Sequence, residues 1–522
     1  MRARTIKPHR PPASSEASPP ETKAKMSGTI DHTTKGNAAA LSAAPYAAML
    51  KSTAYGRLRA EHPAEFAPSS VFFTHDDDRS GGSAIDRRNS FRVKAALVYE
   101  AVTGKLVDDH MLRANSLLLA LASKCHSKIS GQAEGNRRIV RRPDCNHSSP
   151  YTIESDTTCL LISFSDAVAD AEAGDATDVT DEHWDAKKQL VVDGIFLVVG
   201  FLPKLNEAIT TKNADRDSVD QIFKSRHMLD MVTDVIKLEN QLWLQDLLNV
   251  ARHIEAVVKE TVGHSDFKDV KESMGVGREY KLDVTEQNLA DVIHRFCWYY
   301  SPFSTKKPAA APKDSPFKDV VASGKEAAAR TLLDCLHMSV VKPALGKSGS
   351  VTGRPSRMPT ARDLRRSGVR LQASENGRAE IEFTQPAVSM PALVYDFKLA
   401  TVARNLLARE YEEQSKPITR YFQMVNEIVE DAADVRILRR AGVVRGGSGG
   451  AQEVHELIKN IDGHATYPSV YVAMDREIDK VREYHDQRMA NFFVRNRPGV
   501  IWASSVAAIS VAAIVATRRK RG

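Results

Sequence analysis

The feature that most constrains this chain is an apolar run of 13 residues, Leu190 to Leu202, which precedes a long amphipathic segment from Arg226 to Gly263. The run is too short to cross a bilayer, but it is long enough for a buried helix or a tight pair of strands. Asp193-Gly194 within it is a hairpin signal between apolar flanks, although Leu190 to Val192 is short for a strand. The residues alone therefore leave helix and hairpin open, and either places this run in the core.

The amphipathic segment predicts a single long helix. At about 100° per residue, such a helix carries an apolar stripe made of Val232, Ile236, Trp243, Leu247, Val250, Ile254 and Val257. Glu239 falls on the same stripe, and a buried carboxylate must be paired or hydrogen-bonded. We therefore expect Glu239 to be buried and paired, with Asn240 and Gln241 in the same polar network. A general acid or base with a raised pKa is the alternative role for Glu239.

The C-terminal segment predicts a membrane anchor. Val500 to Thr517 contains no charged residue and is flanked by arginines and a lysine on its two sides. As a helix it is about 27 Å long, close to the roughly 30 Å hydrocarbon core of a bilayer. We expect a single transmembrane helix over residues 498–517, with membrane lipid around Val500 to Thr517; a buried core helix is the alternative. Because no N-terminal secretory signal is visible, the large domain is expected in the cytosol.

The same segment also carries a ridge of small residues. Its members recur every four residues: Ser504, Ala508, Ala512 and Ala516. Such a ridge lets two helices approach closely and would support a homodimer through the tail. An alanine-rich composition also produces this spacing without any dimer.

Composition and motifs argue against several functional classes. The net charge of +7 is mild, and no recognition motif accompanies the basic clusters, so we expect no nucleic acid partner. The five cysteines are widely spaced and lack zinc-knuckle spacing, which indicates reduced thiols, no metal and no cofactor. Gly446 to Gly450 fits the G-x-S-x-G pattern of hydrolases but lies in a glycine run after only Val443-Val444. We find no catalytic constellation and expect no enzyme activity.

The chain divides by composition into five parts. Residues 1–45 have almost no large apolar side chains, so we expect disorder there. Residues 46–300 and 358–495 form the two parts of a helical domain, with a short strand at Ala379 to Phe383. Between them, residues 301–357 are rich in Pro, Lys, Gly and Ser and predict a linker or long loop. The expected fold is mainly α, with minor β structure, a disordered N-terminus and one C-terminal transmembrane helix.

Four sequence blocks resemble signature blocks of the plant family called domain of unknown function 247. They are LVVDGIFLVV (190–199), DVIKLENQLWLQDLL (234–248), MPTARDLRRSGVRLQ (358–372) and PALVYDFKLATVARNLLARE (391–410). The family usually has proline where this chain has Trp243, so we expect the helix break at that point to be absent here. The blocks mark as structural candidates Asp193, Gly194, Glu239, Asn240, Gln241, Arg404, Asn405 and Glu410.

The resemblance implies further expectations. It favours a helix for Leu190 to Leu202. It implies a plant-specific, membrane-anchored protein that binds protein partners in recognition or signalling, since some family members are associated with pollen and pistil recognition. It favours the plasma membrane or an endomembrane, while the basic tail leaves an organelle outer membrane open. The alternative function is a membrane-bound enzyme with a site around Glu239.

Overall fold

The structure is a computed structural model in which the residues from Ala43 onward belong to one compact unit. It describes residues 53–73, 84–107, 111–135, 186–211, 215–223, 226–274, 280–308, 331–341, 356–411, 413–447, 449–462, 472–490, 505–506 and 508–511. The segment 1–45, much of the expected linker 301–357 and most of the expected membrane span 498–517 lie outside these ranges, as do Cys145, Cys159 and Ser448.

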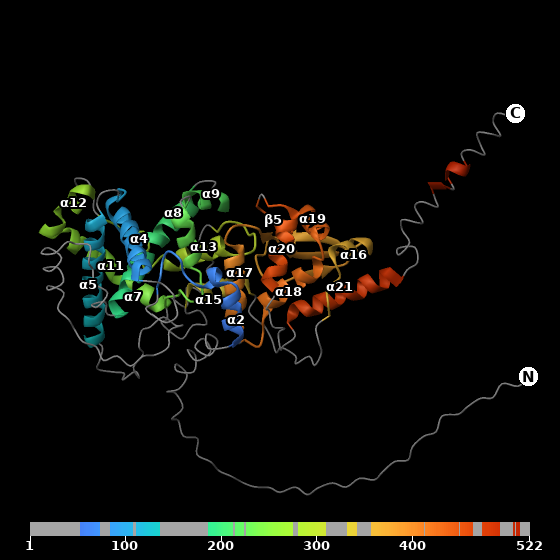
Figure 1. Cartoon of the computed structure of the whole chain (residues 1–522), viewed down its shortest axis with the longest axis horizontal. Helices are drawn as coiled ribbons and strands as arrows, with labels where there is room; N and C mark the ends of the chain where they lie inside the picture. The colour runs from blue at the N-terminus through green and yellow to red at the C-terminus, as the bar shows by residue number, and fades with distance from the viewer. Residues whose placement is uncertain are drawn as a thin grey trace, which may run out of the picture. The chain divides into compact units, whose positions relative to one another are not determined.

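Helices dominate the described chain (Figure 1), as expected for a mainly α fold with minor β structure. The first half contains α2 (Thr53–Glu61), α3 (Pro63–Phe66), α4 (Ala84–Thr103), α5 (Met111–Gly135), α7 (Ala186–Ile195), the π-helical η3 (Phe196–Phe201), α8 (Leu202–Thr210), α9 (Arg216–Ile222), α10 (Arg226–Asp234), α11 (Leu244–Val262), η4 (Ser265–Phe267), α12 (Lys268–Met274) and α13 (Leu289–Tyr300).

The second half contains all the named strands among its helices. Its elements are α15 (Leu332–Val340), α16 (Ala361–Arg366), β1 (Arg370–Ser374), β2 (Glu382–Thr384), β3 (Ala387–Pro391), β4 (Leu393–Val394), α17 (Leu399–Arg409), α18 (Pro417–Ile428), α19 (Ala432–Arg440), β5 (Val444–Arg445), α20 (Ala451–Asp462) and α21 (Ala473–Ala490).

The apolar run Leu190 to Leu202 is helical, so the hairpin alternative is wrong. α7, η3 and α8 follow one another without interruption and pack against α4, α5 and α11. Asp193 and Gly194 lie inside α7. Gly194 allows the close approach of α11, because a Cβ there would lie 2.8 Å from Cγ2 of Val250. The run is the centre of the core of the first half.

One helix in the described ranges, Gln189–Thr210, is long and apolar enough to cross a membrane. However, 72% of its apolar window is buried inside the protein, as expected for a core helix. Of the expected span Val500 to Thr517, the structure describes Ser505, Val506 and residues 508–511, and these are helical and exposed.

The amphipathic segment from Arg226 to Gly263 is not one helix, contrary to the expectation from its periodicity. α10 ends at Asp234, the chain turns, and α11 begins at Leu244. Trp243 is the N-cap of α11, with φ −67° and ψ 134°. This φ is the value to which proline is restricted. The helix break at this position is therefore present, although Trp stands where the resembled family usually has proline.

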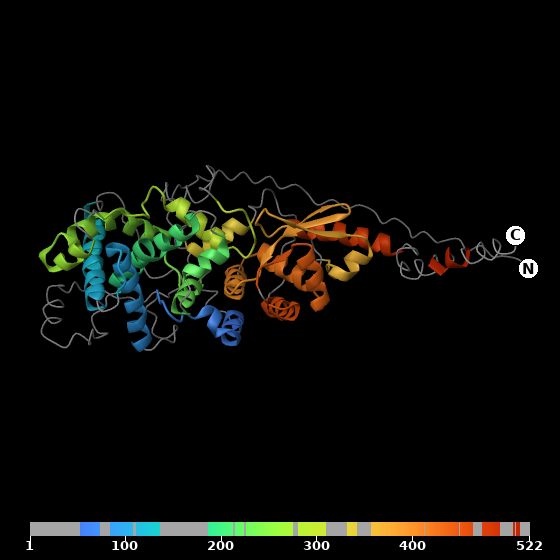
Figure 2. The ribbon, with the colours of Figure 1, turned by 90° about the horizontal axis from the view of Figure 1, so that it is seen from above.

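The second half contains a three-stranded sheet with the order β1-β3-β2. β1 runs parallel to β3, and β2 runs antiparallel to it. The expected strand at Ala379 to Phe383 is shifted to Glu382–Thr384. α21 packs against β2 (Figure 2), and Oε2 of Glu477 accepts a hydrogen bond of 3.0 Å from the Phe383 amide.

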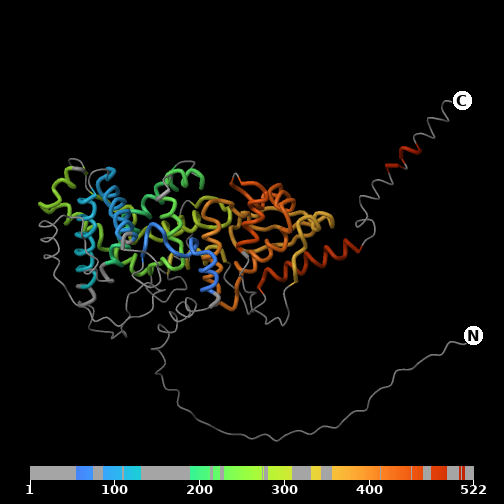
Figure 3. The backbone as a smooth tube through the Cα atoms, viewed as in Figure 1, coloured from blue at the N-terminus to red at the C-terminus, as the bar shows by residue number. Residues whose placement is uncertain are grey.

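Backbone hydrogen bonds and packed helices join the halves of the chain. Residues 302–304 run beside β4, where the amide of Val394 donates to the Pro302 carbonyl at 2.9 Å and that of Ser304 donates to the Ala392 carbonyl at 2.7 Å. The early helix α3 packs against α17, and Figure 3 shows this blue segment beside the orange trace of α17. The two halves therefore share backbone hydrogen bonds and packed helices.

We predict that limited trypsin digestion of the full chain in mild detergent cuts first between residues 309 and 355 and leaves the halves associated. The Pro, Lys and Gly content of this stretch favours cleavage, and the connections described above hold the products together. Size-exclusion chromatography of the nicked protein measures the outcome, with the same sample in concentrated urea as control. Two fragments that separate without urea would contradict a shared core.

Candidate functional site: a polar junction between α10 and α11

The turn between α10 and α11 carries polar side chains that contact several remote segments of the chain. We call this cluster the polar junction, and its members are Asp234, Lys237, Glu239, Asn240 and Gln241. The apolar residues of the turn, Val235, Ile236 and Leu238, are at most 1% exposed and fix the turn in the core. Polar groups at such depth must be hydrogen-bonded, so their partners define the site.

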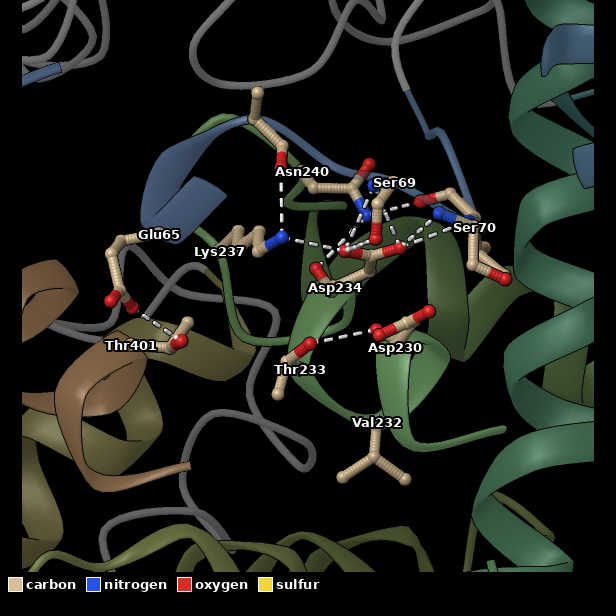
Figure 4. A network of polar contacts seen from close by, with 12 residues as sticks. Glu65, Ser69, Ser70, Asp230, Val232, Thr233, Asp234, Lys237, Asn240 and Thr401 are labelled. Carbon is tan, nitrogen blue, oxygen red and sulfur yellow. Dashed lines mark hydrogen bonds and ion pairs between the residues drawn. The ribbon is translucent and has the colours of Figure 1, made fainter. Parts of the chain in front are cut away.

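The Asp234 carboxylate is the centre of the junction (Figure 4). It is 0% exposed and accepts hydrogen bonds from the backbone amides of Ser69, Ser70 and Val71, at 3.0, 2.6 and 3.0 Å. The ammonium group of Lys237 lies 2.8 Å from the other carboxylate oxygen and also donates to the Ala67 carbonyl at 2.7 Å. These donors compensate for the loss of water around the buried charge.

Asn240 holds the same early loop from the other side. Its Oδ1 accepts a hydrogen bond of 2.6 Å from the Phe73 amide, and its Nδ2 donates to the carbonyls of Val71 and Asp234 at 2.8 and 3.0 Å. The side chain is 0% exposed. The Asn240 amide therefore joins residues 71–73 to the end of α10.

Gln241 reaches α15. Its Nε2 donates to the carbonyls of Val235 and Lys237, both at 2.9 Å, and its Oε1 accepts from the Leu333 amide at 3.0 Å. Leu333 lies in the first turn of α15, where amides lack partners within the helix. Gln241 therefore closes the turn and caps a helix of the second half. Its place beside Asn240 in one buried network is as expected.

Glu239 is paired, as expected, but it is not in the middle of an apolar helical stripe. Its Oε1 lies 2.6 Å from Nε of Arg59 and accepts a hydrogen bond of 2.7 Å from the Tyr55 hydroxyl. Its side chain is 14% exposed, and that of Arg59 is 34% exposed. The expectation that Glu239 is buried is wrong, because the helix ends before Glu239 and the turn directs its partly exposed side chain toward α2.

Arg404 and Asn405 bring α17 to the junction. Oδ1 of Asn405 accepts from the Leu238 amide at 2.7 Å, and its Nδ2 donates to the Glu65 carbonyl at 2.8 Å. Nη1 of Arg404 lies 2.7 Å from Oε1 of Glu65, and the hydroxyl of Thr401 donates to Oε2 of the same carboxylate at 2.6 Å. Burial lowers the pKa of Arg404, and the charge of Glu65 opposes that shift. α3 is thus held by a charge-assisted pair.

Glu410 forms a separate buried site at the C-cap of α17. Its carboxylate is 0% exposed and accepts hydrogen bonds from the amides of Ile418 and Thr419, at 3.0 and 2.8 Å, and from the Thr419 hydroxyl at 2.9 Å. Nε2 of His337 in α15 lies 3.0 Å from Oε1. Glu410 therefore satisfies the N-terminus of α18 and joins it to α15 and α17.

Asp193 lies in α7 and is paired with Lys94 of α4. Oδ1 of Asp193 lies 2.5 Å from the ammonium group, and both side chains are at most 1% exposed. Lys94 also donates to the Phe72 carbonyl at 2.5 Å, and Nε2 of Gln189 donates to Oδ1 of Asp193 at 2.8 Å. Burial lowers the pKa of Lys94, whereas the Asp193 charge raises it. Because the loop through Phe72 and Phe73 also contacts Asn240, this pair is linked to the polar junction.

A second polar cluster lies beside α13 and was missed by sequence reasoning. The buried ammonium group of Lys398 lies 2.7 Å from Asp396 and 3.3 Å from Asp220. The Tyr299 hydroxyl donates to Asp220 at 2.6 Å, and burial raises the pKa of Asp220. These groups come from three separate regions of the sequence. Asp396 and Lys398 lie in the block 391–410, but Asp220 and Tyr299 lie in none of the four blocks. They hold α9, α13 and the start of α17 together.

The glycines of the G-x-S-x-G match have a structural role. Gly446 and Gly447 have φ of 79° and 68°, and added Cβ atoms would lie 3.0 Å from the Tyr395 carbonyl oxygen and 2.2 Å from Cδ1 of its ring, respectively. They form the loop between β5 and α20. Within the described ranges, no group of three or more His, Cys, Asp or Glu side chains is arranged to hold a metal ion.

The family of this chain is shown by a match to a sequence model, and the matched range contains the polar junction. The sequence model of the family domain of unknown function 247, described as "Plant protein of unknown function", matches residues 174–516, about two thirds of the chain. The chain belongs to this family. A protein of Arabidopsis thaliana named "Putative UPF0481 protein" is 29% identical over 136 residues, which are 25% of this chain and 26% of the relative. The match thus spans about a quarter of that relative. No solved structure matches the chain.

The family match includes the polar junction and α17 but not all of their partners. Glu65, the loop from Ser69 to Phe73, and Lys94 all precede residue 174. Asp234, Asn240 and Asn405 of the family blocks therefore bind a part of the chain that the family model does not match. Gln241 and Glu410 instead bind segments inside the match.

We predict that Asn240→Ala lowers the free energy of unfolding by about 2 to 3 kcal/mol, because it leaves the buried Phe73 amide and Val71 carbonyl without a partner. Glu239→Ala should cost about 1 kcal/mol, because Arg59 is partly exposed and can be hydrated when its partner is removed. Urea denaturation of the full chain in mild detergent, followed by tryptophan fluorescence, measures both. Equal losses of unfolding free energy would contradict the conclusion that Asn240 contributes more to stability than Glu239.

We also predict that Lys94→Met lowers the free energy of unfolding by about 3 to 5 kcal/mol, because Asp193 is left buried without its cation. The double variant Lys94→Met/Asp193→Leu should recover more than half of this loss. The exposed pair of Lys128 and Glu260, 37% and 53% exposed, is the control, and Lys128→Met should cost less than about 1 kcal/mol. A double variant less stable than Lys94→Met would refute this account of the pair.

Proposed function

We propose that this chain is a membrane-anchored, non-catalytic scaffold that binds protein partners, as a recognition or signalling component. The observation that carries the proposal is that polar residues of the family blocks bond to other segments of this chain. Asn240, Gln241, Asn405 and Glu410 use their polar atoms to join segments of this chain, and all four are at most 1% exposed. Groups committed in this way stabilise an architecture, so we assign partner binding to the exposed surface around it.

The proposed anchor is the segment Val500 to Thr517. Its described residues are helical, and Val506, Ile509 and Val511 are 42%, 69% and 60% exposed. The hydroxyl of Ser510 donates to the Val506 carbonyl at 2.8 Å, which satisfies the polar group within the helix as a lipid environment requires. Exposed apolar side chains on a helix with internally bonded hydroxyls support burial in lipid.

We place the large domain on the cytosolic side. Cys125, Cys297 and Cys335 are free and buried, and burial raises the pKa of the Cys125 thiol to about 12. Such thiols are stable as small apolar groups in a reducing compartment. The plasma membrane or an endomembrane is the proposed location.

A membrane-bound enzyme with a site around Glu239 is the alternative function. Glu239 contacts Arg59 and Tyr55 of α2, so its carboxylate is engaged in joining the turn to that helix. Replacement by Gln separates the two functions. If Glu239→Gln keeps wild-type stability, partner binding and cellular phenotype, the scaffold is supported; loss of the cellular phenotype at unchanged stability and partner binding would favour the enzyme.

We predict that the full chain expressed in plant cells remains in the membrane pellet after an alkaline carbonate wash, and that the chain truncated after Arg497 does not. Hydrophobic insertion resists carbonate, whereas peripheral attachment does not. Protease added outside sealed vesicles should digest the large domain of the full chain. A truncated chain that stays in the carbonate pellet would refute the anchor, and a protected large domain would refute the cytosolic placement.

A further inference from the structure

An arginine-rich element lies at the end of α16 and the start of β1 and has no part in the polar junction. Arg365, Arg366 and Arg370 are all exposed there. The turn between them contains Ser367, which is the C-cap of α16 and is itself buried. Arg365 and Arg366 thus precede this turn at the end of α16, and Arg370 follows it at the start of β1.

The last turns of α21 contact the same turn. Nδ1 of His485 lies 3.0 Å from the Ser367 hydroxyl, and Nε of Arg488 donates to the Ser367 carbonyl at 3.4 Å. Arg488 is also exposed and lies over the ring of Tyr484. We call the surface formed by Arg365, Arg366, Arg370 and Arg488 the basic face.

The basic face has an excess of positive charge. Arg366 is paired with Asp363 at 3.1 Å. In the part of the chain that the structure describes, Arg365, Arg370 and Arg488 form no ion pair with a carboxylate. Exposed like charges on one surface repel one another, and an anionic surface would relieve that repulsion.

The sequence places this face next to the proposed anchor. α21 ends at Ala490, and residues 491–499 precede the first residue of the span, Val500. Nine extended residues reach about 30 Å at most. The connecting residues include Arg495 and Arg497, which add positive charge. Residues 491–499 therefore keep the end of α21 within about 30 Å of the bilayer surface, which is about three to four Debye lengths at physiological ionic strength.

We infer that the basic face docks on the anionic phospholipid headgroups of the membrane in which the chain is anchored. This inference rests on the proposed anchoring. Guanidinium groups bind phosphate oxygens in a bidentate way, and basic residues beside a membrane span bind anionic leaflets. Docking through this face fixes the orientation of the domain, so that the surfaces away from α16 and the end of α21 are presented to partners.

The test uses the full chain reconstituted into vesicles of phosphatidylcholine alone or of phosphatidylcholine with phosphatidylserine. Hydrogen–deuterium exchange of residues 364–371 and 484–490 should be about five-fold slower on the anionic vesicles, and high salt should remove the difference. The variant Arg365→Glu/Arg366→Glu/Arg370→Glu should lose the protection. The matched control Lys268→Glu/Lys271→Glu/Lys281→Glu changes the net charge equally on exposed residues elsewhere and should keep it. Thermal unfolding verifies that both variants are folded.

Carbonate-resistant insertion into the neutral vesicles is scored in the same samples and separates the two proposals. Insertion with equal exchange on both vesicle types overturns the docking inference and leaves the anchor intact. Failure to insert overturns the anchor and, with it, the inference. Protection lost equally in the control variant shows a general charge effect and also overturns docking through this face. Protection by a soluble acidic peptide without vesicles assigns the face to a protein partner and overturns the lipid inference.

Discussion

The buried carboxylate of Asp234 is the interaction on which much of this architecture depends. A charge at this depth is tolerated only when donors surround it, and three of the donors are consecutive amides of the loop that begins at Ser69. The turn and the loop therefore have to form together. Once formed, the loop presents Phe72 to Lys94 and Phe73 to Asn240, so one charged contact fixes several others.

This arrangement separates the residues that build the fold from those available for function. The turn contacts α17 through Asn405 and α15 through Gln241, so both halves of the chain converge on the same few residues. Such residues are costly to replace because each change disrupts two or more segments at once. Surface residues carry no comparable constraint, and they are where members of one family can differ in their partners.

Much of the helical content was predictable from the sequence, but the tertiary pairing was not. The run from Leu190 to Leu202 is helical, and the motif residues Asn240 and Gln241 do form a buried network. The prediction of one helix through Glu239 failed because Val235, Ile236 and Leu238 are buried within a turn and prolong the apolar periodicity beyond the end of α10. Hydrophobic spacing reports burial, and it does not by itself report a continuous helix.

The partners of the candidate residues were beyond local sequence reasoning for a different reason. Lys94 lies in a helix with no feature that distinguishes it from a surface lysine, and Glu65 lies in a one-turn helix 339 residues before Arg404 in the sequence. Pairing over such separations depends on the complete fold. The resemblance to family blocks identified Asp193 and Asn405 as important, and only the three-dimensional contacts give the physical reason.

The path of the early segment has a consequence for how the protein is made. Glu65 and Asn405 are joined by a hydrogen bond across 340 residues. At about 5 to 20 residues per second, a ribosome needs roughly 20 to 70 s to synthesise the chain between them. During that interval, α3 and its loop are outside the ribosome without their binding site on α17, and their apolar side chains are exposed. During biosynthesis, α3 and its loop therefore depend on chaperones or on transient contacts until α17 has been synthesised.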